Sequence, residues 1–514
     1  MQWLNTVVDE LIKNHKDGEI VVSSGVSPSG AYHVGTLREV MTAEVIMREL
    51  HRRGRKSRHI HVSDDLDVFR KVPAGLPETY SKYLGMPLCD VPAPDGSDQS
   101  YADFYLAELP RVAEGLRLEM EVMRAHAKYR DGFFTEMIEK SLTNIDAIRK
   151  IIADVSGREV DDSWSPVQVM EEGYMKSRKF VSIDTKAKTL AYEDKDGQAQ
   201  TIGYADGKVK LNWRIDWPAR WVLLNVLAEP FGRDHATKGG SYDTGAVIVK
   251  DVFGHEAPYP IPYHFINRTG ETKKMSKSGG DTITAAQLLE MLPPEIVWYF
   301  MLKLAPEKQL FFDAGPTLIR LVDEFSELIA KEDKTEADQQ LLELCMIRID
   351  QPTVSNVPFS HLVASYQTSL KDVDKTLEVI KRTEHAGTAE KDAEVIKREL
   401  KFIDHWLEEY APDDVKFSLK DTVDASTFDT PQKQFMSDLA DMIESAPADA
   451  DGEWFHKAVY DLKEATGLQS RELFITLYLA LIGKTSGPRA GWFLSTLPRD
   501  WLVARLRLEQ GPER

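Results

Sequence analysis

Two short segments of the chain carry the residue types best suited to chemistry on a phosphate. The first is Pro28-Ser29-Gly30-Ala31-Tyr32-His33-Val34-Gly35-Thr36, which leads into a helical pattern. A helix start offers unpaired N–H groups and the positive end of a dipole, which suit an anion. The glycines let a phosphate or a purine approach the backbone, and His33 can donate to a phosphate oxygen. Taken alone, the segment also fits a simple helix-capping loop.

The second segment is Lys273-Lys274-Met275-Ser276-Lys277-Ser278-Gly279-Gly280. Its ammonium groups would suit a polyphosphate that gains negative charge in a transition state. A solvated basic turn is the alternative for this segment by itself. Both segments fall in the same predicted α/β region, and together they favour a nucleotide-dependent enzyme.

The elements around the first segment must position it. Ile20-Val21-Val22 is typical of a buried parallel strand, and apolar residues from Val34 to Leu50 recur at helical spacing. His59-Ile60-His61-Val62 predicts the next strand, with Asp64 and Asp65 directly after it. This β-α-β order is the start of a doubly wound sheet, in which ligands bind at the carboxyl ends of the strands.

The rest of the chain divides by composition. We expect loop over 73–100, helices over 101–155, a small β-rich insertion over 160–210, strands and loops over 213–265, and helices beyond 305. The predicted fold class is therefore α/β. A doubly wound Rossmann-type catalytic domain would cover 1–305, with an insertion at about 90–210, and an all-α C-terminal region would follow.

Charge and cysteine content exclude several classes of protein. The 514 residues include 64 Lys and Arg against 83 Asp and Glu, a net charge of −19, which argues against non-specific coating of DNA. Cys89 and Cys345 are the only cysteines, so a disulfide scaffold or a Cys-x-x-Cys metal site is excluded. We find no signal-peptide pattern and no long apolar span, and we therefore expect a cytoplasmic protein without a membrane partner.

The two phosphate segments also match the paired signatures of a known family, and the chain resembles the class I aminoacyl-tRNA synthetases, in particular their lysyl-tRNA synthetase branch. Further similar stretches are Ser24 to Gly30, Arg38-Glu39, Asp64 to Pro73, Trp213 to Trp221, Glu229 to His235, Gly239 to Asp243, Pro293-Pro294-Glu295 and Ser486 to Arg489. The resemblance runs through nearly the whole chain.

The resemblance implies a lysine–tRNA ligase that uses ATP, with Mg²⁺, to form lysyl-adenylate and then passes lysine to tRNA(Lys). The lysine carboxylate attacks the α-phosphorus, so no protein nucleophile is needed, and positioning and charge stabilisation carry the catalysis. The resemblance also implies a helical stem over 306–355 and a helical anticodon-binding domain over 356–514, where Arg489 and Trp492 are candidates for stacking on bases.

Site residues follow from the resemblance by position. The catalytic residues implied are His33, Lys274 and Lys277. The ATP-binding residues implied are Pro28, Ser29, Gly30, His33, Gly35, Thr36, Asp234, Lys274, Met275, Ser276, Lys277 and Ser278. The lysine-binding residues implied are Gly25, Ser27, Trp213, His235 and Tyr263. Asp64 and Asp65 are our candidates for the carboxylate that binds the ε-ammonium; capping a helix or pairing with Arg70 is the alternative for both. Trp217 and Trp221 suit core packing.

The insertion departs from the family pattern. Members often carry two Cys pairs there that indicate a structural zinc, whereas residues 160–210 contain neither Cys nor His. We therefore expect no metal site, and an insertion held by the apolar residues Val167, Val169, Phe180, Val181, Ile183, Leu190 and Tyr192.

Two other functions stay open. A class I synthetase for glutamate would want an Arg facing the side chain rather than an Asp pair, and enzymes for cysteine or arginine share the fold. A non-catalytic tRNA-binding paralogue would have no need of both phosphate segments, so their presence argues against it.

Overall fold

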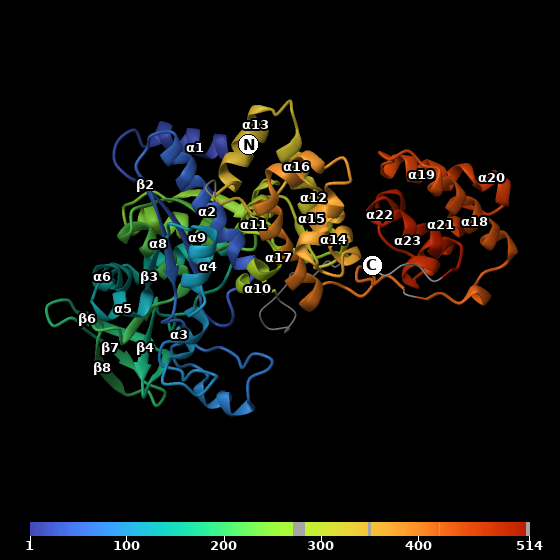
Figure 1. The fold of residues 1–514 in the computed structure, drawn as a ribbon. Helices are drawn as coiled ribbons and strands as arrows, with labels where there is room; N and C mark the ends of the chain where they lie inside the picture. Colours follow the sequence, from blue (N-terminus) through green and yellow to red (C-terminus); the bar gives the residue numbers. More distant parts are fainter. Residues whose placement is uncertain (271–282, 348–350, 421, 510–514) are drawn as a thin grey trace. The chain divides into compact units, whose positions relative to one another are not determined.

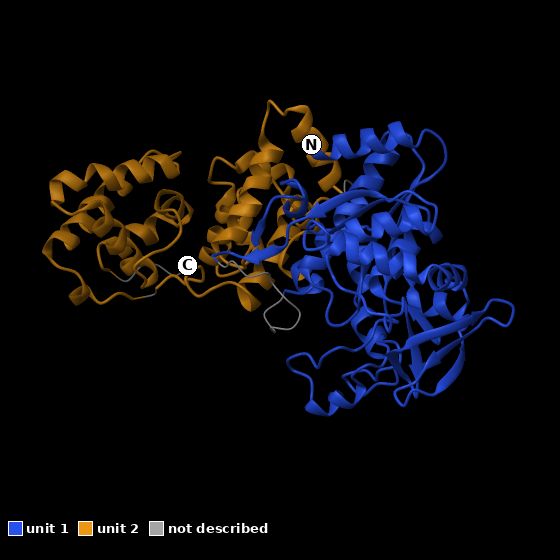
Figure 2. Cartoon of the chain, turned by 180° about the vertical axis from the view of Figure 1, so that it is seen from behind, with its two compact units in different colours: residues 1–289, 300–311 blue, residues 290–299, 312–514 orange. Residues whose placement is uncertain are grey.

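The computed structural model describes residues 1–270, 283–347, 351–420 and 422–509 (Figure 1). The chain forms two compact units, shown in blue and orange in Figure 2. The first comprises residues 1–289 and 300–311, and the second comprises 290–299 and 312–514.

The first unit is built on a parallel sheet, as the sequence predicts. Its strands are β1 (Ile20–Val26), β2 (Ser57–Ser63), β3 (Glu121–Arg124), β10 (Val226–Gly232) and β11 (Tyr259–Tyr263), in the order β11-β10-β1-β2-β3. The β1–β2 register runs from Ile20 opposite Ser57 to Val26 opposite Ser63. Both strands therefore end at one edge, and the loops that follow them meet there.

Helix α2 (Val34–Arg52) covers β1, β2 and β10, and α1 (Gln2–Asn14) packs on α2. Strand β1 and α2 form because their apolar residues are placed for burial: Ile20 and Val22 in the strand and Leu37 and Val40 in the helix are all fully buried. No helix among the described residues is long and apolar enough to cross a membrane.

Two parts of this unit differ from the sequence expectation. Residues Glu121–Arg124, predicted to be helical, form the edge strand β3. The region predicted as strands and loops contains α8 (Trp213–Leu223) and α9 (Ser241–Asp251). Helix α8 contains Pro218 and buries the charged Asp216 and Arg220, which hides its apolar stripe. Its tryptophans at 213, 217 and 221 nevertheless have helical spacing.

The β-rich insertion is confirmed. Its strands are β4 (Val167–Glu171), β5 (Tyr174–Ser177), β6 (Lys179–Asp184), β7 (Thr189–Glu193), β8 (Ala199–Gly203) and β9 (Val209–Leu211), in two antiparallel sheets. The helical segments before it are η1 (Glu78–Tyr83), α3 (Tyr101–Leu106), α4 (Leu109–Leu116), α5 (Ala125–Arg130), α6 (Thr135–Thr143) and α7 (Ile145–Ser156). Most of the apolar residues expected to hold the insertion do lie in its core: Val167, Val169, Leu190 and Tyr192 are buried, and Phe180 and Ile183 are partly buried. The exception is Val181, which is 49% exposed, so its prediction as a core residue is wrong. Val181 points away because β6 has one face in solvent.

The remaining strands and the link between the units are β12 (Ile266–Arg268), α10 (Ala285–Met291), α11 (Pro294–Leu302) and β13 (Leu310–Phe312). The second unit continues as helices, which confirms the all-α C-terminal region. Its helices are α12 (Pro316–Ala330), α13 (Glu336–Cys345), α14 (Phe359–Thr368), α15 (Val373–Ile380), α16 (Ala386–Lys391), α17 (Ala393–Glu409), η3 (Ala425–Thr427), α18 (Thr430–Glu444), α19 (Gly452–Asp461), α20 (Lys463–Thr466), α21 (Ser470–Ile482), α22 (Ala490–Thr496) and α23 (Arg499–Leu506).

Candidate active site

A cavity of about 690 Å³ opens where β1, β2 and β10 end. The residues around it come from these three strand ends and from α2 and α8. Those used below are Ser24, Gly25, Ser27, Ser29, Glu39, Asp64, Trp213, Trp217, Arg220, Glu229 and His235. The structure thus brings together Gly25, Ser27, Trp213 and His235, which the sequence analysis placed in one binding site. This is also where a parallel sheet binds its ligands.

Glu39, in the first turns of α2, is a buried carboxyl group at this cavity. Its Oε1 accepts a hydrogen bond from Gly25 N at 2.8 Å, and its Oε2 accepts one from Tyr263 Oη at 2.7 Å. Burial raises the pKa of Glu39 to about 8. Within the described part of the chain, no Lys, Arg or His side chain forms an ion pair with it. The site therefore holds a carboxyl group that an incoming cation would ionise.

Glu39 was not among the predicted binding residues. The signal that could have found it is its position, because Glu39 is the one of the three glutamates of α2 that lies nearest the loop carrying the phosphate segment. Tyr263, which was named, lies at the end of β11 and reaches the site through its bond to Glu39.

Aromatic side chains form another wall of the cavity. The rings of Trp213 and Trp217 stack with centroids 5.3 Å apart, and His235 lies 5.9 Å from Trp213. Trp217 thus faces the cavity as well as the core, whereas Trp221 is fully buried, as expected for core packing. Trp221 Nε1 donates to Glu229, a second carboxyl that the sequence analysis passed over and whose pKa burial raises to about 7.

Asp64 lies at the cavity, but its charge is already paired. Arg220 Nη2 lies 2.9 Å from one carboxylate oxygen of Asp64, and Lys210 Nζ lies 3.4 Å from the other. Burial alone would raise the pKa of Asp64, but the charges of Arg220 and Lys210 lower it to about 2. This arrangement opposes the expectation that Asp64 receives a substrate ammonium, because that site is filled by two cations of the protein itself.

Asp65 points to α5 and does not line the cavity. Its carboxylate accepts from His126 N at 2.8 Å and His126 Nδ1 at 2.7 Å, and it pairs with Arg124. It therefore caps the start of α5, which is one of the alternatives that the sequence left open. The other alternative is wrong, because Arg70 pairs with Asp67, at 2.7 Å.

The predicted phosphate loop leads into α2 as expected. His33 is the N-cap of this helix, and its Nδ1 accepts a hydrogen bond from Thr36 N at 3.2 Å. A Cβ at Gly35 would lie 2.8 Å from His33 Cε1, so glycine is required for the ring to fold back over the helix start. The helix-capping role is thus real, and it fixes the imidazole at the positive end of the helix dipole.

The stretch Pro28-Ser29-Gly30 connects β1 to this helix start. Ser27 and Ser29 line a second hollow, of about 430 Å³, together with Arg70 and Lys71. Tyr101 Oη donates to Ser29 O at 3.2 Å, so α3 supports the loop. Ser29 of the predicted phosphate segment therefore lies at a hollow whose charged lining residues are Arg70, Lys71 and Asp67, and Asp67 pairs with Arg70.

The second phosphate segment lies outside the described residues. Lys274, Met275, Ser276, Lys277 and Ser278 all fall within 271–282. Asp234 follows β10, and its negative charge raises the pKa values of Glu39 and Tyr263, which places its charge close to both. In the described ranges, no three His, Cys, Asp or Glu side chains gather as a metal would require.

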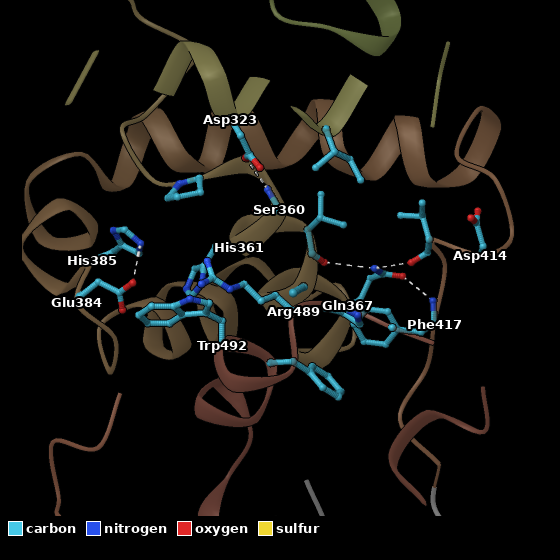
Figure 3. A pocket seen from close by; sticks show the side chains of 18 of the residues that line it. Asp323, Ser360, His361, Gln367, Glu384, His385, Asp414, Phe417, Arg489 and Trp492 are labelled. Carbon is cyan, nitrogen blue, oxygen red and sulfur yellow. Dashed lines mark hydrogen bonds and ion pairs between the residues drawn. The ribbon is translucent and has the colours of Figure 1, made fainter. Parts of the chain in front are cut away.

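A separate cavity of about 450 Å³ lies wholly within the second unit, between α12, α14 and α22 (Figure 3). Trp492, His361 and Arg489 lie together at one side of it. His361 is 7% exposed, its Nε2 has no hydrogen-bond partner among the described residues, and burial lowers its pKa to about 4. Asp323, Glu327, Glu384 and Asp414 give the lining several carboxyl groups.

Comparison with known proteins matches the two parts of the chain separately. Residues 1–351 match the family described as tRNA synthetases class I (K), and residues 367–508 match an anticodon binding domain. The lysine–tRNA ligase of Archaeoglobus fulgidus is 37% identical over 99% of each chain. That of Methanosarcina barkeri is 36% identical over 98% of this chain and 97% of the other. That of Thermococcus kodakarensis is 34% identical over 99% of this chain and the whole of the other.

Proposed function

The chain belongs to the class I tRNA synthetases of the lysine (K) family, and on that premise we propose how its cavities divide the work of lysine–tRNA ligation. It is an ATP-dependent ligase. In the first step the lysine carboxylate attacks the α-phosphorus of ATP, which gives lysyl-adenylate and pyrophosphate. In the second, a hydroxyl of the terminal adenosine of tRNA attacks the lysyl carbonyl, and AMP leaves.

Glu39 is the observation that supports lysine as the amino acid. A lysine ε-ammonium needs a carboxylate in a closed pocket, because burying an unpaired charge is expensive. Glu39 is buried at the cavity and carries neutral donors, Gly25 N and Tyr263 Oη, rather than a protein cation. The ammonium would lie against this carboxyl and ionise it, between Gly25, Ser27 and the aromatic wall of Trp213 and His235.

On this proposal Glu39 binds the ε-ammonium, and Asp64 and Asp65 do not. Asp64 would instead hold Lys210 of β9 and Arg220 of α8 in place under the aromatic wall. Asp65 would hold the start of α5. Both would act through structure and not by touching lysine.

ATP would bind along the loop before α2. His33, Gly35 and Thr36 would place its phosphates at the helix start, with Pro28, Ser29 and Gly30 lining the approach. Lys274, Lys277, Met275, Ser276 and Ser278 would neutralise and bind the departing pyrophosphate, and Asp234 would contact the ribose or the lysine. We expect Mg²⁺ to arrive bound to ATP, and no zinc in the insertion, whose residues 160–210 hold no Cys or His.

The cavity of the second unit would receive an unstacked base of the tRNA(Lys) anticodon. The residues that match an anticodon binding domain, 367–508, include Trp492 and Arg489. An aromatic ring and a guanidinium are the groups on which splayed bases stack, and His361 Nε2 offers a buried polar atom for a base edge. The surrounding carboxyl groups would repel phosphates and so favour the base over the backbone.

We divide the chain accordingly into a catalytic domain over 1–305, a helical stem over 306–355 and an anticodon-binding domain over 356–514. The cytoplasm, where charged tRNA is used, would be its place of action. DNA is not expected as a partner.

Transfer of lysine to tRNA tests this function. The purified chain is incubated with ATP, Mg²⁺, labelled lysine and unfractionated tRNA, and acid-precipitable lysine is counted. We expect label in tRNA that is released by mild base, as an ester is, and no label when ATP is left out. Labelling with a different amino acid but not with lysine would contradict the assignment.

A further inference from the structure

A continuous chain of buried polar side chains runs beneath the active site, and the reaction as described does not use it. Tyr32 Oη lies 2.5 Å from His61 Nε2, and His61 Nδ1 lies 2.7 Å from Ser24 Oγ. Ser24 Oγ lies 2.7 Å from His59 Nε2, and His59 Nδ1 lies 2.9 Å from Glu44 Oε2. These five residues, here called the relay, join the phosphate loop, β1, β2 and α2.

The geometry of Ser24, His59 and Glu44 is that of a nucleophile, a base and an orienting carboxylate. Burial argues against that reading, because Ser24, His59 and Glu44 expose no surface to solvent and Ser24 Oγ is already bonded to two imidazole rings, although Ser24 itself lies at the wall of the cavity. A metal pair at His59 and His61 is also excluded, because the two rings are 6.5 Å apart and both bind Ser24 between them.

With His59 in its neutral form, counting donors gives the relay one direction. Glu44 can only accept when ionised, so His59 Nδ1 then donates to it and the neutral His59 Nε2 accepts from Ser24 Oγ. Ser24 Oγ then accepts from His61 Nδ1, and His61 Nε2 accepts from Tyr32 Oη. Each donor in the relay has one acceptor. The Glu44 end is held in place by a further bond, because Glu44 also accepts from Glu119 N at 2.8 Å.

Protonation is consistent with that direction. Burial lowers the pKa of His61 to about 3, which keeps its ring neutral. Burial would raise the pKa of Glu44, but its hydrogen bond from His59 lowers it, so Glu44 stays ionised. With both rings neutral, every donor and acceptor of the relay is satisfied, and such networks rigidify the groups at their ends.

The other end of the relay is Tyr32, which is important for the site because it directly precedes His33 in the phosphate loop. Tyr32 O accepts from Ala285 N at 2.7 Å, Val34 N donates to Ile283 O at 3.1 Å, and His33 pairs with Thr284 in an isolated bridge. The Tyr32 side chain, 2% exposed, adds a bond to His61 of β2, so this stretch is held by β2 through one side chain and by residues 283–285 through its main chain. A shift of Tyr32 would move the imidazole of His33 with it.

We propose that Tyr32 and His61 are positioning residues for the adenylation step: through Ser24, His59 and Glu44 they fix the loop that carries His33 in the place that ATP requires. This rests on the proposed role of His33 in binding ATP. Neither residue touches the substrates. Their effect reaches the reaction through the placement of one imidazole and the helix start beside it.

The test removes one oxygen atom. Tyr32→Phe keeps the ring and the packing but loses the hydrogen bond to His61. Lysine-dependent pyrophosphate exchange is measured with ATP and lysine varied in turn. We expect kcat/KM for ATP to fall about 10-fold, since small misplacements of catalytic groups cost that much or more, whereas KM for lysine changes less than about 2-fold.

Tyr204→Phe is the matched control. Tyr204 is equally buried and donates to Glu139 at 2.9 Å, but it lies in the β-rich insertion. We expect it to lower the melting temperature somewhat and to leave both substrates unaffected. His61→Gln, whose amide oxygen can still accept from Tyr32, should retain more ATP-dependent activity than His61→Leu.

Two results would overturn the inference. One is an unchanged kcat/KM for ATP in folded Tyr32→Phe, and the other is an equal loss for ATP and lysine, which marks general damage. If Tyr32→Phe does not fold, the test uses His61→Gln and His61→Leu. For these variants too, the inference requires a loss in kcat/KM for ATP that is larger than the change in KM for lysine. A wild-type chain inactive with lysine would instead refute the proposed function, so the two failures are distinct.

Discussion

Arg220 Nη2 lies 2.9 Å from Asp64 Oδ2, so one of the two carboxylates that the sequence offers to a substrate ammonium is already neutralised from within. Lys210 and Asp216 complete this buried group of charges, with Arg220 between the two carboxylates. Glu39, by contrast, presents its carboxyl to the same cavity without a partner cation among the described residues. The two positions predict opposite effects of mutation.

Asp64→Asn should destabilise the fold and spare lysine binding. It leaves Lys210 and Arg220 with too little negative charge in a buried site, which typically costs about 3–5 kcal/mol. Chemical denaturation measures the loss. Asp146→Asn is the control, because its pair with Arg149 is on the surface, Asp146 being 92% exposed, and should be worth less than about 1 kcal/mol. A large rise in KM for lysine in folded Asp64→Asn would indicate that Asp64, and not Glu39, binds the substrate ammonium.

Glu39→Gln should weaken lysine binding and leave the stability of the fold largely unchanged. It removes the charge that pairs with the ammonium but keeps a side chain of the same shape. Losing one partner of a buried charge pair costs about 3 kcal/mol, or roughly 100-fold in affinity. Steady-state pyrophosphate exchange should show this as a rise in KM for lysine, with KM for ATP nearly constant. A parallel change in both constants would mean that Glu39 only supports the fold.

Glu39 also predicts a pH dependence with a definite sign. Its pKa in the empty site is raised to about 8 by burial, and only the ionised form can pair with an ammonium. The kcat/KM for lysine should therefore rise with pH, by up to about 10-fold per unit, and level off above about pH 8. The profile for ATP should lack this step. A wild-type profile for lysine that is flat between pH 6 and 9, or the same step in Glu39→Gln, would count against the assignment.

The proposed role of the second unit's cavity in binding an anticodon base can be tested by measuring the KM for tRNA. Arg489→Ala removes an exposed guanidinium beside Trp492 and His361 without opening the core. We expect KM for tRNA to rise about 10-fold, as for loss of one stacking contact, with lysine and ATP constants unchanged at saturating tRNA. Arg471→Ala, at another exposed arginine of the same unit, is the control. Equal effects of both variants would indicate a diffuse electrostatic contribution instead of a base site.

Local patterns explain what the sequence could predict. The β1–loop–α2 unit follows from apolar residues at strand and helix spacing, and the His33–Gly35 spacing reflects contact between near neighbours. Trp213 and His235 were assigned to one site only through family resemblance, and both line the cavity. The insertion was predicted because its alternating pattern is also local.

What the sequence could not show depends on partners far apart along the chain. Asp64 meets Lys210, 146 residues away, and Glu39 meets Tyr263, 224 residues away. No local pattern reports which carboxylate a distant cation will occupy. Strand β3 was missed for the same reason: a four-residue edge strand is defined by its partner β2, and its own residues are compatible with a helix.

Amino-acid-dependent exchange of pyrophosphate into ATP, run with each standard amino acid in turn and both with and without tRNA, tests the central claim most directly. We predict exchange that depends on lysine, and that Glu39→Gln largely abolishes at lysine concentrations near the wild-type KM. Exchange with another amino acid in preference to lysine, or with none of them under either condition, would contradict the assignment.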